Sequence, residues 1–159
     1  MTGRVPGPPP ARTCVTKSLS MVVRRWHEWM AVAKGVGIQT SHVLRAAGWL
    51  GLSARTARET LAALHDRTGL TAGNGSLMRT APLALAYLDD EAALVEAARR
   101  VSDLTHYDPE AGDACVLRCF AIRHAILTGL LDVRIGLQHI DADRLGLRVR
   151  CVPIAAMHG

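Results

Sequence analysis

The sequence predicts an all-α fold, a multi-helix bundle built as one domain. Aromatic residues make up only 4% of the 159 residues although 49% are hydrophobic, so leucine, alanine and valine must fill most of the core. Alanine and leucine are strong helix formers, whereas aromatic residues are enriched in strands. No stretch alternates apolar and polar residues as a half-buried strand does. Capping residues also precede several apolar segments, which favours helices joined by short loops.

The net charge of +5 comes almost entirely from arginine, because Lys17 and Lys34 are the only lysines. Together with the many alanines, glycines and leucines, this indicates a biased genome composition more than a nucleic-acid-binding surface. No run of about 18 apolar residues is present to span a membrane. The basic N-terminal segment lacks the apolar stretch of a signal peptide. We therefore expect a cytoplasmic protein with neither a membrane nor a nucleic-acid partner.

Proline and glycine dominate the first residues, so residues 1–17 are predicted to be disordered. The helical domain is expected over residues 18–147, and a tail over residues 148–159. The first helix of the domain should run from Ser18 to about Ala33. Large apolar residues recur in it at helical spacing and predict a face toward the core, namely Met21, Val22, Trp26, Trp29 and Met30.

The next two helices have recognisable starts. The glycines of "KGVGIQT" end the first helix, and Thr40 or Ser41 can cap the segment "HVLRAAGWL". Ser53 can cap "ARTARETLAALHDR", which ends before Gly69. A further helix contains Pro82 and is expected to be kinked there or to begin near it. The segment "EAALVEAARRVSDL" then follows Asp89 and Asp90 as another helix.

The clearest helix start is at Asp108, a good N-cap residue followed by Pro109 at the first helical position. This helix should reach about Thr128. Its apolar residues cover more than one face, which predicts a helix inside the bundle; they are Ala111, Cys115, Phe120, Ile122 and Ile126. A shorter helix is expected from about Asp132 and another after Asp141.

The four cysteines show no CxxC spacing, although Cys115 and Cys119 fall on one helical face. Buried free thiols are the simpler interpretation of this pair. The alternative is a zinc site that uses cysteines with His106 or His124, for which the spacing is unfavourable. Cys14 and Cys151 stand apart from the pair in the sequence.

The stretch "GNGSLMRTAPLALAYL", residues 73–88, allows two interpretations. Gly73 or Asn74 can adopt the left-handed conformation that ends a helix, with Ser76 capping the next one. Alternatively, the glycines let backbone N–H groups approach a ligand phosphate at a helix N-terminus.

Residues 41–66 resemble the helix-turn-helix of small transcription factors. Gly51 would lie in the turn, and Ser53–Leu64 would form the recognition helix. Arg55 and Arg58 would then meet phosphates or guanine edges. The pattern is weak, because any two capped helices joined by a glycine turn reproduce it. A DNA-binding module is therefore the alternative function from another class.

A more specific resemblance joins two motifs. "GNGSLMRTAPLAL" followed about thirty residues later by "LTHYDPEAGDA" resembles the ADP-ribosylglycohydrolase family, which includes dinitrogenase-reductase-activating glycohydrolases and crystallin J1-like proteins. The likeness extends upstream through "WMAVAKGVGIQTSHVLRAA" and covers roughly residues 25–145. It implies a partial ADP-ribosylglycohydrolase-like all-α fold over residues 18–147. It also implies hydrolysis of the glycosidic bond that joins ADP-ribose to a protein side chain or a small molecule.

The resemblance also implies a substrate-binding set. The loop formed by Gly73, Asn74 and Gly75 is expected to lie against ADP-ribose, and His106 to contact its ribose-phosphate part. A helical hairpin between the two motifs would bring Asn74 and His106 to one end of the bundle, each just before a helix N-terminus where a diphosphate is favoured. Both loops should face one pocket. Arg79 can pair with phosphate or serve as a structural ion-pair partner.

The chain departs from the family in its acidic residues. Members resembling it hold two magnesium ions with Thr-Asp-Asp-Thr and Asp-x-Asp-Thr motifs, and neither motif is present. Asp89 and Asp90 stand on the wrong side of the glycine loop. Asp141 and Asp143 are followed by Arg144 instead of threonine. Magnesium needs several oxygen ligands, so we assign no metal ligand and no catalytic residue.

These departures lead us to expect an internal fragment of an ADP-ribosylglycohydrolase that is inactive alone. A catalytically dead ADP-ribose binder is the alternative within the same fold. The ADP-ribosylated substrate is not specified by the sequence. Helix faces made to be buried in a larger bundle should also cause self-association.

Overall fold

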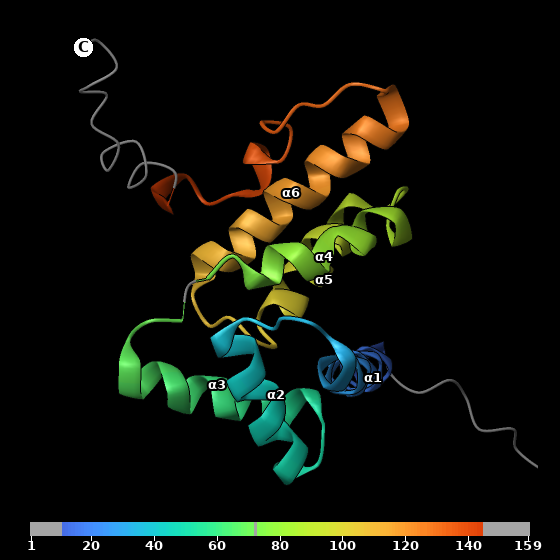
Figure 1. Cartoon of the computed structure of the whole chain (residues 1–159). Coiled ribbons are helices and arrows are strands. Elements are labelled where there is room, and N and C mark those ends of the chain that lie inside the picture. The colour runs from blue at the N-terminus through green and yellow to red at the C-terminus, as the bar shows by residue number, and fades with distance from the viewer. Residues whose placement is uncertain (1–10, 72, 145–159) are drawn as a thin grey trace, which may run out of the picture.

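A computed structural model describes residues 11–71 and 73–144 and confirms the all-α fold (Figure 1). Within these residues the chain forms no strand. Its helices are α1 (Ala11–Val32), α2 (Ile38–Leu50), α3 (Ala54–Thr68), α4 (Gly75–Ala86), α5 (Glu91–Ser102), α6 (Pro109–Thr128) and the short 3-10 helix η1 (Leu137–His139). None of the helices described is both long and apolar enough to cross a bilayer.

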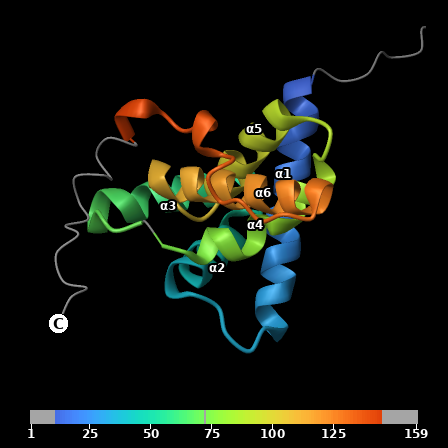
Figure 2. The same ribbon diagram turned by 90° about the horizontal axis from the view of Figure 1, so that it is seen from above.

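The helices form two groups, each around its own apolar cluster. Helices α1, α2 and α3 contact one another, and Figure 1 shows them below α4, α5 and α6. Figure 2 shows α6 between α4 and α5, and it contacts both, as expected for a helix inside the bundle. Leu83 of α4 packs against both apolar clusters, so it joins the two groups.

Helix α1 differs from the prediction in its start and in the face that it buries. It begins at Ala11, because "ARTCVTK" contains no glycine or proline, so residues 11–17 are helical where disorder was predicted. Residues 1–10 lie outside the described residues. Leu19 and Val23 are buried, whereas Met21 and Trp29 are exposed. Val22, Trp26 and Met30 are partly buried against the cluster.

The ends of α2 and α3 follow local capping chemistry with one exception. Helix α2 begins at Ile38 with Gly37 at the N-cap position, earlier than predicted, so Thr40 is buried in its first turn and does not cap it. Ser53 caps α3 as predicted: its hydroxyl accepts a hydrogen bond from the N–H of Thr56, and the Thr56 hydroxyl accepts one from the N–H of Ser53, which completes a capping box. Gly69 then ends α3 in the left-handed conformation.

The second group begins and ends mostly where predicted. Helix α4 contains Pro82 in its interior but begins at Gly75, well before the proline. Asp90 caps α5 by accepting a hydrogen bond from the N–H of Ala93. Asp108 caps α6, which runs to Thr128 as expected. Ile126 is 45% exposed near the end of α6, so that part of the expected apolar face is only partly covered.

The helix expected from Asp132 is instead a turn followed by η1. This segment folds back onto α6, where Gly136 is buried. A Cβ atom at Gly136 would lie 3.1 Å from Phe120 Cβ and 3.2 Å from Leu117 Cα. The close approach to α6 therefore sets the local conformation, which sequence periodicity does not reveal. The helix expected after Asp141 begins at Ala142, and residues 145–159 lie outside the described part of the chain.

Substitution Gly136→Ala is expected to lower the free energy of unfolding by about 1–3 kcal/mol, because the new methyl group would press on the backbone of α6. Chemical denaturation measures the change. Gly35→Ala is the matched control, since nothing lies within 4 Å of its Cβ position. Equal effects of the two substitutions would show that crowding at residue 136 is not the cause.

Several large apolar side chains are exposed in the described part of the chain, which is the basis for the predicted self-association. We expect the average mass in sedimentation velocity to rise with protein concentration. A monodisperse monomer over a wide concentration range would contradict this. The exposed residues include Ile38, Trp49 and Leu50 of α2, Leu127 at the end of α6, and Leu130, Leu131 and Val133 after it.

Candidate functional site

The loop before α4 packs directly on the ring of His106. A Cβ atom at Gly73 would lie 3.2 Å from His106 Nε2, and one at Gly75 would lie 3.1 Å from His106 Cε1. Neither glycine has a positive φ, and Asn74 has a φ of −80°, so the first of the two interpretations of this loop, a left-handed cap, is wrong. The two glycines are needed for close approach to the imidazole.

Ser76 is also not the cap of α4. Asn74 occupies the N-cap position without a side-chain hydrogen bond, and Ser76 is buried within the first turn. Its hydroxyl lies 3.4 Å from the Cys115 thiol of α6. The first turn of α4 is thus anchored to α6 while Asn74 remains exposed in front of it.

His106 is 2% exposed and is held by its neighbour in the chain. Its Nδ1 atom lies 2.9 Å from the Thr105 hydroxyl, which accepts a 2.6 Å hydrogen bond from Arg79. The Gln39 amide donates to the carbonyl oxygens of Thr71 and Thr105, at 3.0 and 2.5 Å, and so links α2 to both loops. Burial, reinforced by the Arg79 charge, lowers the pKa of His106 to about 4, which keeps the imidazole neutral near pH 7.

Arg79 connects this network to the tryptophan wall, by which we mean the Trp26 and Trp29 side chains that line a cavity beside it. Its guanidinium lies 4.7 Å from the centre of the Trp26 ring, a cation–π distance. Its buried Nε atom has no hydrogen-bond partner. Burial lowers the pKa of Arg79 to about 10, so it stays charged near neutral pH. Among the described residues no carboxylate forms a salt bridge with Arg79, so it is not the structural ion-pair partner that the sequence allowed.

Asn74 and Gly75 line a cavity of about 450 Å³ beside this arginine. The cavity size falls within the range of small-molecule sites. His106 does not line it, because its ring lies beneath the glycine loop. The two predicted loops therefore meet, but they do not both face this cavity. It is lined by Trp26, Trp29, Gly35, Val36, Gly37, Asn74, Gly75, Met78 and Arg79.

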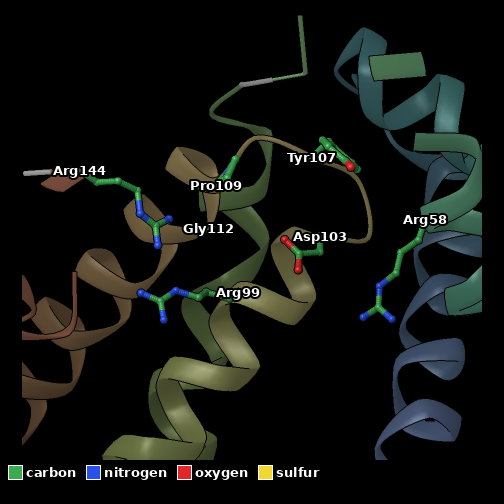
Figure 3. Close-up of a pocket in the computed structure, with 7 residues that line it drawn as sticks. All are labelled: Arg58, Arg99, Asp103, Tyr107, Pro109, Gly112 and Arg144. Carbon is green, nitrogen blue, oxygen red and sulfur yellow. The ribbon is translucent and has the colours of Figure 1, made fainter. Parts of the chain in front are cut away.

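Tyr107 instead reaches a second cavity, of about 470 Å³, shown in Figure 3. Figure 3 shows the Asp103 carboxylate between Arg58 of α3 and Arg99 of α5. Arg99 forms a salt bridge with the buried carboxylate of Asp113 at 3.1 Å. Arg58, proposed above as a DNA-contacting residue, is thus part of a cavity wall between helix groups.

Arg55, the other arginine of the helix-turn-helix interpretation, forms an exposed ion pair with Glu59 one turn along α3. The opposite face of α3 is buried through Ala54, Ala57 and Leu61.

Cys115 and Cys119 are buried free thiols, as expected. Burial raises the pKa of Cys119 to about 11, so its thiol stays protonated. The side chains of Cys14 and Cys151 lie outside the described residues.

The residues present do not fit a magnesium pair. All 14 acidic residues fall within the described part of the chain, yet no three of its His, Cys, Asp and Glu side chains lie close enough to share an ion. Asp90 is occupied as the cap of α5, and Asp141 accepts a hydrogen bond from the N–H of Asp143. The cavity beside the glycine loop contains a cationic arginine and no carboxylate.

The sequence interpretation missed three residues of this network. Thr105 precedes His106 within the quoted motif, and its hydroxyl is the group that binds the imidazole. Gln39 lies next to the expected cap at Thr40 but connects two distant loops. Trp26 was assigned only to the core. The position of Thr105 next to His106 in the sequence could have indicated its role. The roles of Gln39 and Trp26 could not be inferred in this way, because they depend on contacts between segments far apart in the chain.

Comparison with known proteins identifies the family of the chain. Searches of curated proteins and of solved structures gave no match. The family model described as ADP-ribosylglycohydrolase matches residues 11–151. This match extends beyond residues 25–145 at both ends, so the resemblance is longer than the sequence analysis allowed. It includes both motifs and the whole network around His106, and the chain therefore belongs to the ADP-ribosylglycohydrolase family.

Proposed function

We propose that this chain binds the ADP-ribose part of an ADP-ribosylated protein or small molecule in the cavity beside the glycine loop. One observation supports the proposal above all: three features line the same cavity. They are the N-terminus of α4 at Asn74 and Gly75, the Arg79 cation, and the tryptophan wall. A helix N-terminus and a guanidinium both favour a diphosphate. A tryptophan face favours a nucleobase.

The four predicted substrate-binding residues take different parts in this proposal. Asn74 and Gly75 line the cavity and would meet the diphosphate directly. Gly73 and His106 lie against each other behind it, so they would act mainly by fixing the loop. His106 can reach the ligand only through its edge under the loop, since 98% of its surface is covered.

Trp29→Ala is expected to weaken ADP-ribose binding about tenfold, because Trp29 lines the cavity and base–aromatic stacking contributes about 1–3 kcal/mol. Isothermal titration calorimetry with ADP-ribose and with ribose 5-phosphate measures the loss. The matched control is Trp49→Ala, because Trp49 is 92% exposed on α2 and does not line this cavity. If wild type binds no ADP-ribose, or if both variants bind as well as wild type, the assignment of this cavity is wrong.

We further propose that the chain by itself does not hydrolyse ADP-ribosylated substrates. In relatives resembling it, two magnesium ions are expected to serve the reaction. The acidic side chains here are arranged as helix caps and ion-pair partners, exemplified by Asp90 and Asp113, and not as a shared set of ligands. Binding and hydrolysis are thus separable properties of this chain.

A further inference from the structure

The Thr105 hydroxyl is buried between two nitrogen-bearing side chains. Thr105 is fully buried, and its Oγ1 atom lies 2.6 Å from Arg79 Nη2 and 2.9 Å from His106 Nδ1. Arginine carries only donors, so Oγ1 accepts the hydrogen bond from Nη2. The single hydrogen of the hydroxyl has no other acceptor recorded in the described part of the chain.

This arrangement decides where the imidazole carries its proton. If Nδ1 were protonated, Oγ1 would accept from both Arg79 and His106, and the hydroxyl hydrogen would be buried without a partner. An unsatisfied buried polar group is costly. With Nδ1 unprotonated, the hydroxyl donates to it, and both the Thr105 hydroxyl and His106 Nδ1 are satisfied. The ring proton then stands on Nε2, since the adjacent Arg79 cation disfavours a second proton.

Nε2 is the edge of the ring that faces the glycine loop. It lies 3.2 Å from the Cβ positions of both Gly73 and Gly75. Within residues 11–71 and 73–144 no hydrogen-bond partner is recorded for Nε2. The side chain is therefore nearly fully buried, and its Nε2 edge faces the loop that begins α4 without a recorded partner among the described residues.

We propose that Arg79 is a positioning residue that acts through Thr105 to fix His106 as its Nε2–H tautomer. Because Arg79 donates to the Thr105 hydroxyl, the hydrogen of that hydroxyl is donated to His106 Nδ1. The ring N–H is then at Nε2, where it points toward the glycine loop and toward an anionic or hydroxyl group bound there. The effect of the fixed tautomer on ligand affinity depends on the proposed ADP-ribose function. The tautomer itself exists in the free protein and does not depend on it.

Nitrogen-15 NMR of the imidazole ring in the ligand-free protein at pH 7 tests the proposal. We expect one unprotonated Nδ1 and one protonated Nε2 for His106 in wild type. A predominant Nδ1–H tautomer, or rapid exchange between the two tautomers, would overturn the proposal. This result is obtained whether or not ADP-ribose binds, so a failed binding assay is distinguishable from a failed tautomer assignment.

Three variants separate positioning from a general loss of structure. Thr105→Val removes the hydroxyl with little change of side-chain shape, whereas Thr105→Ser keeps the hydroxyl. Arg79→Met removes the donor but keeps an extended apolar side chain. We expect tautomer averaging at His106 in the valine and methionine variants and the wild-type pattern in the serine variant.

The same variants should change affinity in parallel. Where wild type binds ADP-ribose, Thr105→Val should weaken binding roughly fivefold, the effect of one neutral hydrogen bond. Thr105→Ser should bind as wild type does. If Arg79→Met does not fold, wild type and the threonine pair still decide the tautomer. An unchanged tautomer in a folded Arg79→Met protein would show that Arg79 does not act through Thr105.

Discussion

The purified chain, supplied with magnesium or manganese, is expected to release no ADP-ribose from ADP-ribosyl-arginine or ADP-ribosyl-serine peptides. Metal-assisted hydrolysis needs oxygen ligands placed around each ion, typically six for magnesium. The carboxylates of the chain are distributed over helix caps and ion pairs, and no three potential ligands within the described residues come together. Binding of ADP-ribose without added stabilisation of the transition state gives no acceleration.

Chromatographic detection of free ADP-ribose over many hours measures the expected absence of turnover. The control is His106→Ala, assayed with and without a chelator. Release that disappears both with the chelator and with the His106 substitution would contradict the prediction. Such a result would show that the chain, alone or as an oligomer, forms a metal site that its acidic residues do not reveal.

The sequence predicted best those features that depend on a few neighbouring residues. Ser53 and Asp108 cap helices as expected, because an N-cap acts on N–H groups two or three residues away. The buried face of α1 was harder to predict. Its apolar residues surround more than half of the helix, and packing against α2 and α3 decides that Leu19 and Val23 are buried while Met21 is exposed.

The sequence indicated that the glycine loop and His106 would come together, but it did not indicate how they are arranged. The glycines of the loop allow either positive φ or close approach, and a single sequence does not distinguish them. Only the contact with His106, more than thirty residues away, shows that close approach is the reason. The burial of His106 and its link to Arg79 likewise arise from packing between the loop and the segment after α5.

Acidification from pH 7 to about pH 4 is expected to lower the free energy of unfolding through His106. The pKa of this imidazole is about 4 in the fold, against an ordinary value of 6.5, first because of burial and then because of Arg79. Between these two values the unfolded chain binds a proton that the folded chain does not. Stability is therefore fully present above pH 6.5 and is lost as the pH falls toward 4.

The size of this loss is on the order of 3 kcal/mol, which follows from about 1.4 kcal/mol for each pH unit between the two values. Denaturant unfolding at a series of pH values measures it. Acidic residues also lose favourable interactions in this range, so the comparison with His106→Asn isolates the histidine. Asparagine keeps a hydrogen-bonding group near Thr105 but does not titrate.

The variant should show a shallower decline in stability between pH 6.5 and 4 than wild type. Proton NMR titration of the His106 ring in wild type gives the same answer directly, even if the asparagine variant is too unstable to study. A ring that titrates near pH 6.5 in the folded protein would contradict the prediction. It would mean that the loop formed by Gly73, Asn74 and Gly75 opens readily in solution, because only loss of the covering loop restores water to the imidazole.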